Sequence, residues 1–542
     1  MTADRDAEIA LLRSPPFPRA APSLSRAGIV DGRPPDAAKI ERIFMAIREA
    51  EIGGRFWSPP ARETGYAVVV RAKSAAEITA LRAGLSDAER AAALALLPAD
   101  DIDPWSLLKS GARLLAHGDD EWTALAHIAG CPVRILSSGR FGAPGAGEAD
   151  IRRDVVRALL DRRYLDPFTG RDCDIETTIA HLADWRRTLV ANGGIVAACG
   201  IAWWKRQEIA RFLWTPRHSL RFFHSERRAI AHAAQAGGEI AIWPSRISAQ
   251  MAEAARAKHV PLVRVEDGFV RSVGLGSQLV PPSSIAVDRL GIHYDPNHPS
   301  DLETLLAHAA FPPPLLERAT RLRERILAAG ISKYGGDEGH AFPARQTGRR
   351  LVLVPGQVED DMSVRLGGGG LSSNLELLRR TRALEPDAEI WFRPHPDVDA
   401  GHRKGTVQDS DALLHADRVV RGGGMARLLD QVDAVHVLTS LTGFEALLRA
   451  REVLCHGTPF YAGWGLTRDL APAPERRGRQ LTIAQLVAAV LILYPRYLDP
   501  VTLLPCSPEV LIDRMTDGTA HNRGSWITGL RKIQGRLRRR QS

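Results

Sequence analysis

The sequence predicts an α/β protein with two successive Rossmann-like domains, residues 191–345 and 346–515, which face a cleft and follow a mainly helical region. Buried-strand patterns alternate with helix patterns through both domains, and a polar stretch at residues 332–350 separates them. Such alternation is typical of parallel sheets whose faces are covered by helices. Polar clusters follow several of the strands, at the sheet edge where open α/β sheets bind ligands. We therefore expect the functional residues in these loops.

The composition is that of a globular chain with more than one domain. Its 542 residues exceed one typical domain. The 44% of hydrophobic and 25% of charged residues argue against wholesale disorder. The sequence has no apolar run of about 18 residues and no secretory signal pattern. Five scattered cysteines without a CxxC spacing argue against disulfides and a zinc site, and favour a reducing, cytoplasmic environment.

The N-terminal part reads as two regions. Residues 1–35 are rich in proline, which fixes the backbone and lacks an N–H group, so we expect a leader without regular structure. Residues 36–190 are rich in alanine and leucine, and segments such as 75–81 and 87–94 have helix patterns. Short apolar runs that could be strands are residues 66–71 and 133–136.

Part of this region is similar to the C-terminal part of the chain. Arg163-Tyr-Leu-Asp-Pro-Phe-Thr169 recurs as Arg496-Tyr-Leu-Asp-Pro-Val-Thr502, and Ala112-Arg-Leu-Leu115 recurs at residues 426–429. A repeat of long period indicates a duplicated architecture. We interpret residues 36–190 as a reduced half-copy of a domain, retained for packing or docking. Chance similarity between short segments is the alternative.

The first Rossmann-like domain contains a turn with two acids. Its expected strands are residues 194–200, 239–243, 259–265, 284–288 and 291–294, and its expected helices include residues 203–213 and 247–258. Glu266 and Asp267 follow the third strand, and Gly268 and Arg271 come next. Two carboxylates and a guanidinium after a strand are unusual in a core and favour a site. A solvated loop is the alternative.

The second domain has its own acidic cluster. Its expected strands are residues 350–354, 388–392, 418–420, 434–438 and 453–455. Gln357, the three acids of residues 359–361 and Ser363 follow the first of them. These acids offer a carboxylate nucleophile or base. We do not expect a metal, because no histidine or further acid follows at ligand spacing.

Two further clusters suggest phosphate binding. Arg393 and His395 follow the second strand, and prolines on both sides of His395 hold its backbone for contact with a phosphate or a reacting oxygen. A structural histidine is the alternative.

After the fourth strand, Ser440, Thr442 and Gly443 open a helix whose N–H groups and positive dipole end suit a phosphate. Glu445, one turn later, could accept ribose hydroxyls. The sequence has no Walker motif and no dinucleotide fingerprint with its partner acid, which argues against a dehydrogenase. From the residues alone, a nucleotide-sugar transferase or epimerase fits best.

The C-terminal end is basic and amphipathic. Residues 518–542 carry seven arginines and lysines and no acid, with apolar residues near helical spacing. We expect the tail, residues 516–542, to bind an anionic membrane surface. A frayed tail without a partner is the alternative. Nucleic acid is not expected as a partner, because no binding module accompanies the charge.

Six motifs then make the chain specific. In chain order they are Glu266-Asp-Gly-Phe-Val-Arg-Ser-Val-Gly-Leu-Gly276, Val354-Pro-Gly-Gln-Val-Glu-Asp-Asp361, Arg393-Pro-His-Pro-Asp397, Thr439-Ser-Leu-Thr-Gly-Phe-Glu-Ala446, Pro459-Phe-Tyr-Ala-Gly-Trp-Gly-Leu-Thr467 and Tyr494-Pro-Arg-Tyr-Leu-Asp-Pro500. Together they closely resemble the bacterial capsule β-Kdo transferases of the KpsC/LipB type, over roughly residues 190–515.

The resemblance implies a GT-B-like, retaining glycosyltransferase that uses CMP-β-Kdo as donor and needs no cofactor or metal. Its implied acceptor is a Kdo-terminated (lyso)phosphatidylglycerol linker at the cytoplasmic face of the inner membrane, onto which capsular polysaccharide is built. A capsule assembly or export complex is a further implied partner. Members carry two complete transferase domains, whereas this sequence shows one, so we expect one catalytic site and one linkage type.

The resemblance also implies roles for single residues. Asp361 stands at the position of the retaining nucleophile, and Glu266 at that of the acid/base, with Asp267 as its local rival. The residues expected to bind the donor nucleotide are His395, Ser440, Thr442, Gly443, Glu445 and Gln357. Arg271 and Arg393 are our candidates for the Kdo carboxylate, which a guanidinium fork suits.

Two other functions compete with this interpretation. One is a different nucleotide-sugar enzyme on the same scaffold, either a transferase or an epimerase. The other is a non-catalytic protein of capsule export or assembly. The second is disfavoured, because the acids and the histidine expected of the intact unit are all present.

Overall fold

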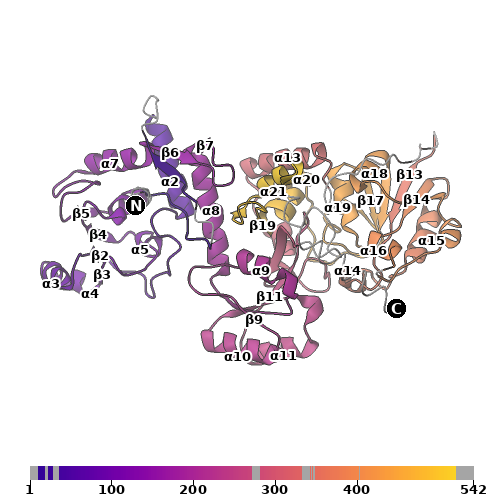
Figure 1. Cartoon of the computed structure of the whole chain (residues 1–542), viewed down its shortest axis with the longest axis horizontal. Coiled ribbons are helices and arrows are strands. Elements are labelled where there is room, and N and C mark those ends of the chain that lie inside the picture. Colours follow the sequence, from indigo (N-terminus) through magenta and orange to yellow (C-terminus); the bar gives the residue numbers. More distant parts are fainter. Residues whose placement is uncertain are drawn as a thin grey trace. The chain divides into compact units, whose positions relative to one another are not determined.

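The computed structural model describes residues 10–18, 22–28, 36–270, 281–331, 342, 345, 348–401 and 403–519. The chain divides into two compact units (Figure 1). Unit 1 comprises Met1–Gly194 and Leu213–Ser219, and unit 2 comprises Ile195–Phe212 and Leu220–Ser542. The division at Gly194 lies close to the start that the sequence predicts for the first Rossmann-like domain.

Unit 1 is built on a four-stranded parallel sheet with the order β3-β2-β4-β5. The strands are β2 (Val68–Arg71), β3 (Ala93–Leu96), β4 (Arg113–Ala116) and β5 (Val133–Ile135). The helices are α2 (Ala37–Ala50), α3 (Ala75–Ala83), α4 (Asp87–Ala91), α5 (Trp105–Leu108), α6 (Glu121–Ala129), α7 (Glu148–Leu160) and α8 (Ile175–Asn192). Val69, Val70 and Leu114 are fully buried, so the sheet forms the centre of this unit's core.

Residues 36–190 are mainly helical as expected, and the two runs that could be strands, residues 66–71 and 133–136, contain β2 and β5. Helices are the longer elements there, but they accompany a parallel sheet. The segment 87–94, which has a helix pattern, ends as a helix at Ala91 and continues as β3, which pairs with β2. Alanine and leucine favour helices only weakly, and pairing with a neighbouring strand overrides that preference.

The described parts of residues 1–35 also differ from the expected irregular leader. β1 (Ser25–Ala27) pairs antiparallel with β6 (Arg162–Leu165), which in turn pairs with β7 (Asp172–Cys173). Leu11, Leu12 and Phe17 are buried. The prolines exclude strand pairing only where they stand, so the residues between them remain able to pair and to pack.

The first half of unit 2 contains a seven-stranded sheet with the order β20-β19-β12-β11-β10-β8-β9. Its parallel strands are β8 (Ile195–Cys199), β9 (Arg221–Phe223), β10 (Glu239–Ile242) and β11 (Leu262–Asp267). Its antiparallel strands are β12 (Ser284–Asp288), β19 (Pro495–Leu498) and β20 (Pro505–Cys506). The helices and short turns are η1 (Trp203–Lys205), α9 (Arg206–Phe212), α10 (Glu226–Ala236), η2 (Pro244–Arg246), α11 (Ala249–Ala257), α12 (Asp301–His308) and α13 (Pro313–Ala328).

The position of β19 and β20 corrects the predicted domain boundary at residue 515. After α20 (Ile483–Val487) and a π-helix (Ala488–Leu493), the chain returns to the first sheet, where α21 (Pro508–Thr516) follows β20. The antiparallel edge at β12 is open to such an addition, because antiparallel neighbours need no crossover helix. Residues 291–294, expected as a strand beside β12, form none.

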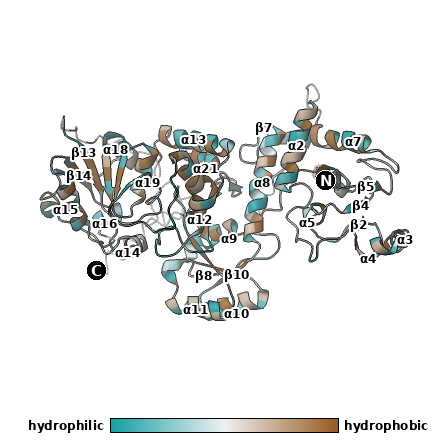
Figure 2. Cartoon of the chain, turned by 180° about the vertical axis from the view of Figure 1, so that it is seen from behind, coloured by the Kyte–Doolittle hydropathy of each residue, from teal (hydrophilic) through white to brown (hydrophobic). Residues whose placement is uncertain are grey.

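The second half of unit 2 contains a six-stranded parallel sheet with the order β15-β14-β13-β16-β17-β18. The strands are β13 (Leu351–Pro355), β14 (Glu389–Arg393), β15 (Arg418–Val419), β16 (Ala434–Val437), β17 (Glu452–Cys455) and β18 (Arg468–Asp469). The helices are α14 (Met362–Gly367), α15 (Asn374–Leu384), α16 (Pro396–Asp399), α17 (Asp409–Ala412), α18 (Met425–Gln431) and α19 (Leu441–Leu448). Figure 2 shows β13 and β14 as hydrophobic strands near more hydrophilic helices. All five strands predicted here are confirmed.

The two halves of unit 2 share one hydrophobic core. It includes Phe269 and Ala286 from the first half, and Leu353, Val435 and Phe444 from the second. The π-helix and α20 contribute to the same core and pack on α13. The loops after the strands of both sheets are therefore held in one compact unit, which is the condition for a site made from both halves.

The return to the first sheet ends in a turn around a buried carboxylate. Asp499 is fully buried and accepts hydrogen bonds from the backbone and the hydroxyl of Thr502, at 3.0 and 2.7 Å. Arg514, from α21, pairs with the same carboxylate at 3.0 Å. The ion pair therefore ties α21 to the end of β19.

Unit 1 contains the same turn. Asp166 accepts hydrogen bonds from the backbone and the hydroxyl of Thr169, at 2.7 and 2.9 Å, and His181 from α8 lies 3.4 Å away. The order β3-β2-β4-β5 also matches β14-β13-β16-β17. In each set, the strand that comes first in the chain (β2 or β13) has the next one (β3 or β14) on one side and the later two on its other side. A duplicated domain would share both the turn and the strand order. The half-copy stays our interpretation.

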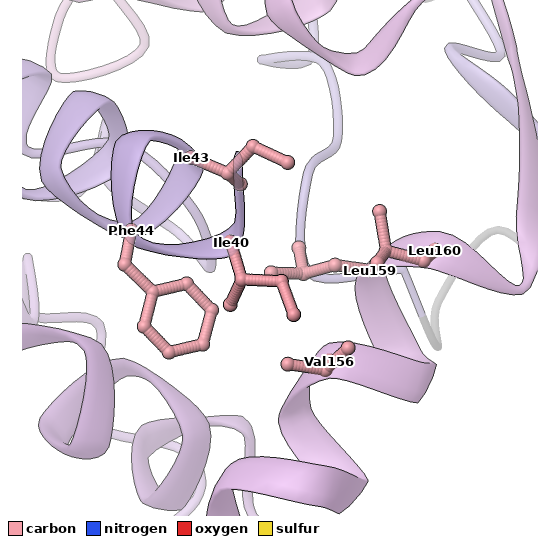
Figure 3. A pocket seen from close by; sticks show the side chains of 6 residues that line it. All are labelled: Ile40, Ile43, Phe44, Val156, Leu159 and Leu160. Carbon is pink, nitrogen blue, oxygen red and sulfur yellow. The ribbon is translucent and has the colours of Figure 1, made fainter. Parts of the chain in front are cut away.

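A shallow apolar hollow lies between α2 and α7 of unit 1 (Figure 3). Its lining residues are Ile40, Ile43, Phe44, Val156, Leu159 and Leu160. None of these side chains carries a polar or ionisable atom, so the hollow offers no group for phosphate binding or proton transfer. The polar clusters that the sequence predicts as a site all lie in unit 2.

We expect Asp499→Ala to destabilise unit 2 by about 3 kcal/mol or more, because it removes a buried carboxylate that Arg514 contacts. Asp409→Ala is the matched control: Asp409 pairs with Arg421 at an exposed site, where such pairs contribute about 1 kcal/mol or less. Denaturant unfolding of both variants measures the difference. Equal losses of stability would contradict the structural role of the buried pair.

Candidate active site

The two acids of the first half form the end of a strand. Glu266 and Asp267 are the last residues of β11 and stand opposite Ala286 and Ile285 of β12. Gly268 then brings the chain against β12, where a Cβ atom would collide with the Ser284 hydroxyl. Only glycine permits this approach. The strand thus ends two residues later than predicted, and the acids lie at its carboxyl end as expected.

Lys205 fixes the second of these acids. Its ammonium lies 2.8 Å from the Asp267 carboxylate and 3.6 Å from the ring centre of Trp243. Lys205 is only 6% exposed, so the pair is largely out of water. An ammonium in this environment is stabilised by both the carboxylate and the aromatic face. Asp267 is therefore held by a cation within the protein.

Glu266, in contrast, has a raised pKa. Burial first, and then the neighbouring Asp267 carboxylate, raise the pKa of Glu266 to about 8, while Asp361 adds to the rise and Lys205 opposes it. Loss of hydration and like charges both disfavour the ionised form. A carboxyl group with a pKa of about 8 carries a proton at neutral pH and can donate it.

An aromatic cluster connects the acid turn to the second half. Phe269 is buried, and its ring centre lies 4.8 Å from that of Phe460 and 6.3 Å from that of Phe444. His293 packs on the same ring at 4.9 Å. Phe444 belongs to α19 and Phe460 follows β17, so both come from the loops at the carboxyl edge of the second sheet.

Asp361, the predicted nucleophile, is the N-cap of α14. Its carboxylate accepts hydrogen bonds from the backbone N–H and the hydroxyl of Ser363, at 3.0 and 2.9 Å. These bonds orient the side chain at the start of the helix. The neighbouring acids are occupied elsewhere: Asp360 pairs with Arg403 at the surface, and Glu359 accepts from the backbone of Asn374.

The Gln357 side chain is hydrogen-bonded within the second half, and its predicted contact with the donor nucleotide stays a prediction. Its side-chain amide donates to the Thr439 hydroxyl at 3.0 Å, and its carbonyl oxygen accepts from the Thr439 backbone at 2.9 Å. The Thr439 hydroxyl in turn lies 3.5 Å from that of Ser363. Gln357 is thus a buried link between the loops after β13 and β16, and both ends of its amide are used within the protein.

The turn before α19 has the predicted form. Ser440 is the N-cap, and its hydroxyl accepts from the Thr442 backbone at 3.2 Å and lies 3.1 Å from the Thr442 hydroxyl. Glu445 lies one turn later and is buried. Gly443 serves the packing: a Cβ there would collide with the Tyr461 hydroxyl, which donates to the Ser440 carbonyl.

His395 and Arg393 lie at the end of β14. His395 is the N-cap of α16, and its Nδ1 accepts from the Asp397 backbone at 3.2 Å. An accepting Nδ1 carries no proton, so Nε2 is the nitrogen that can donate. Arg393 donates to the Gly423 carbonyl at 2.6 Å and stacks over Phe342 at 5.8 Å, so it takes part in bonds within the second half.

Two predictions remain open at the level of the structure. Arg271 and the glycines up to Gly276 lie outside the described residues, so the predicted contact of Arg271 with a sugar carboxylate stays a prediction. Within the described ranges, no three His, Cys, Asp or Glu side chains form a group that could hold a metal ion. The expectation of chemistry without a metal likewise stays a prediction.

The sequence did not single out Lys205, Tyr294 or Thr439. Lys205 stands in η1, shortly after β8, and its position after a buried strand was the signal available. Thr439 begins the motif from which Ser440 was chosen. Tyr294 was assigned to a strand that does not form, although its phenol is subject to the charges of Glu266 and Asp361.

The matches to known proteins cover this site. A sequence profile described as capsule polysaccharide biosynthesis protein matches residues 239–335 and 331–497. The capsule polysaccharide modification protein LipA of Neisseria meningitidis is 41% identical over 429 residues, which cover 75% of this chain and 60% of LipA. The lipopolysaccharide-processing protein LpsZ of Rhizobium meliloti is 47% identical over 243 residues, 44% of this chain and 54% of LpsZ. The chain thus spans little more than half of each relative.

A solved structure extends the match to the fold. KpsC of Thermosulfurimonas dismutans, described as a beta Kdo 2,4 transferase, is 32% identical and has a TM-score of 0.52, and the match covers 59% of this chain and 98% of that structure. The GT-B-like fold that the motifs predict, with two Rossmann-like halves, is confirmed. The Neisseria meningitidis relative carries the name LipA, where the motifs suggested LipB. The chain belongs to the family of bacterial capsule polysaccharide β-Kdo transferases.

Proposed function

We propose that this chain transfers Kdo from CMP-β-Kdo to a Kdo-terminated (lyso)phosphatidylglycerol linker of capsular polysaccharide, with retention of configuration and without a cofactor. One observation carries the proposal: the charge of Asp361, from the second half, contributes to the raised pKa of Glu266 in the first. A retaining transferase needs one carboxyl group that can donate a proton and a second carboxylate that can act as the nucleophile. Membership of the β-Kdo transferase family supports the choice of sugar.

The proposed reaction has two displacements. In the first, the Asp361 carboxylate attacks the anomeric carbon, the bond from that carbon to the phosphate oxygen breaks, and Glu266 gives its proton to the departing CMP. In the second, an acceptor hydroxyl attacks the same carbon, the bond from the sugar to Asp361 breaks, and the Glu266 carboxylate takes the hydroxyl proton. Two inversions retain the configuration, and both acids end as they began.

The structure supports Glu266 over Asp267 as the acid/base. Asp267 is engaged by the Lys205 ammonium at 2.8 Å, which favours a lasting carboxylate. Glu266 has a pKa of about 8 and can therefore exist in both protonation states near neutral pH. In this proposal, the Lys205–Asp267 pair leaves Glu266 as the acid that gains and loses the proton.

The donor nucleotide is proposed to bind at the carboxyl edge of the second sheet. Ser440 and Thr442 place two hydroxyls at the N-terminus of α19, where the helix dipole favours a phosphate. His395 offers Nε2 for a further hydrogen bond to phosphate. Glu445 lies one turn into α19, within a helix that packs on β16 and β17, and we propose it as the acceptor of ribose hydroxyls.

The acceptor places the proposed reaction at a membrane surface. No helix within the described residues is long and apolar enough to span a membrane. The basic tail at residues 516–542 is the segment proposed to bind the anionic cytoplasmic face of the inner membrane, and residues 520–542 of it lie outside the described part. Contact with a capsule assembly or export complex is a further proposal.

Asp361→Asn tests the reaction. We expect incubation of the unmodified chain with CMP-Kdo and a Kdo-terminated lipid analogue to increase the acceptor mass by one Kdo unit. Asparagine keeps the N-cap of α14 but cannot act as the nucleophile, so transfer should fall on the order of 1,000-fold. Asp360→Asn, an exposed neighbour paired with Arg403, should retain activity. Equal activity in both variants would refute Asp361, and a changed nucleotide sugar without transfer would favour an epimerase.

The pKa of Glu266 predicts the pH dependence. The first displacement needs Glu266 protonated, so kcat/KM should be high below about pH 8 and fall as the pH rises through that value. Asp267→Asn removes a negative charge that raises this pKa, so the fall should begin at lower pH. Glu253→Gln, which removes an exposed acid on α11, is the control. A pH profile that Asp267→Asn leaves unchanged would contradict the coupling.

Deletion of residues 520–542 tests the tail. We expect the complete chain to sediment with vesicles that contain anionic phosphatidylglycerol and the truncated chain to remain in the supernatant, with about 1 kcal/mol lost for each basic residue near the surface. Neutral phosphatidylcholine vesicles are the control, and high salt should release the complete chain. Equal sedimentation of the two chains would discard the tail as a membrane anchor.

A further inference from the structure

Tyr294 has a buried hydroxyl that the proposed reaction leaves unused. Its oxygen is shielded from solvent, yet it has no hydrogen-bond partner in the part of the chain that the structure describes. Buried hydroxyls in folded proteins are nearly always paired. An unpaired one at a site indicates that a ligand supplies the partner.

The loop that carries Tyr294 contacts both halves of unit 2. On one side, His293 packs against Phe269, which follows Glu266 and Asp267 by only a few residues, with 4.9 Å between ring centres. On the other side, the Asn297 side chain donates to the carbonyl of Leu366 at 3.2 Å. Leu366 belongs to α14, the helix that Asp361 caps. The loop therefore touches the elements that position both acids.

The surroundings keep this phenol neutral. Burial raises the pKa of Tyr294 well above its usual value, and the charges of Glu266, Asp361 and Asp295 add to the rise, while Arg264 opposes it. A carboxylate nearby disfavours a phenolate because the two charges have the same sign. The hydroxyl therefore remains a donor throughout the pH range in which the protein works.

A neutral donor suits the substrate of the proposed reaction. The donor sugar is an acid with a carboxylate on its reacting carbon, and this carboxylate must approach Asp361 and the acids at the end of β11. Hydrogen bonds that stabilise the negative charge of the sugar carboxylate are needed beside these acids. Arg393, our earlier candidate, already donates to the Gly423 carbonyl and stacks on Phe342.

We propose that the Tyr294 hydroxyl binds the carboxylate of the donor sugar, and that it donates a hydrogen bond to this group while Asp361 attacks the adjacent carbon. This inference rests on the proposed function, since it requires an acidic sugar as donor. It makes Tyr294 a substrate-binding residue that distinguishes an acidic sugar from a neutral one.

Tyr294→Phe removes the hydroxyl and keeps the ring. Binding of CMP-Kdo and of CMP alone is measured by calorimetry in the Asp361→Asn background, where the donor is not consumed. We expect affinity for CMP-Kdo to fall about 10- to 100-fold and affinity for CMP to stay the same. In the ligand-free protein, the thermal midpoint should remain equal or rise, because an unpaired hydroxyl is removed. Tyr66→Phe, at an exposed hydroxyl that bonds Glu63, is the control.

Each outcome separates the two proposals. Unchanged affinity for CMP-Kdo in Tyr294→Phe, or equal losses for CMP and CMP-Kdo, would overturn the role of Tyr294 and leave the transferase in place. A lower thermal midpoint without ligand would show that the hydroxyl is structural and would also overturn it. If the chain with Tyr294 intact fails to bind or transfer Kdo, the proposed function itself falls.

Discussion

The packing of Phe269 against Phe444 and Phe460 is the contact on which the candidate site depends. Phe269 follows the acids of β11, whereas Phe444 lies in α19 and Phe460 follows β17 in the second half. Aromatic pairs of this kind add roughly 0.5–1.5 kcal/mol each to the free energy of burial. Their larger effect is geometric, because close packing permits few alternative arrangements. The proposed acid Glu266 and the proposed nucleophile Asp361 can act on one substrate only while this packing holds the two halves together.

Within that frame, the site separates chemically similar groups by their surroundings. Glu266 and Asp267 are adjacent carboxylic acids on one strand, yet Asp267 contacts the Lys205 ammonium and Glu266 has a pKa of about 8. The difference arises from one buried cation and the amount of water that each acid retains. Neighbouring acids of the second half also have different partners. Of three consecutive acids, Asp361 caps α14, and Asp360 pairs with Arg403 at the surface.

The sequence predicted the elements of unit 2 well, and the partners of its site residues poorly. Strand positions follow from local apolar patterns, and the acids lie at strand ends because the apolar run that marks the buried part of the strand stops there. The hydrogen bonds between Gln357 and Thr439 were missed, since the two residues are distant in the sequence. So were the Lys205–Asp267 pair and the placement of Tyr294, because no local pattern reports a contact between separate elements. In the sheet of unit 1, β3 and β4 were missed because alanine and leucine prefer helices.

The return of β19 to the first sheet has a mechanical consequence. The chain passes from the first half of unit 2 to the second before β13, and it passes back after β18, through α20 and the π-helix. Two covalent crossings between two bodies permit rotation about the line that joins them and oppose twisting and separation. Wider turns of the π type recur in helices at functional positions. The two crossings therefore add a covalent constraint to the shared core that holds the loops of Glu266 and Asp361 in one compact unit.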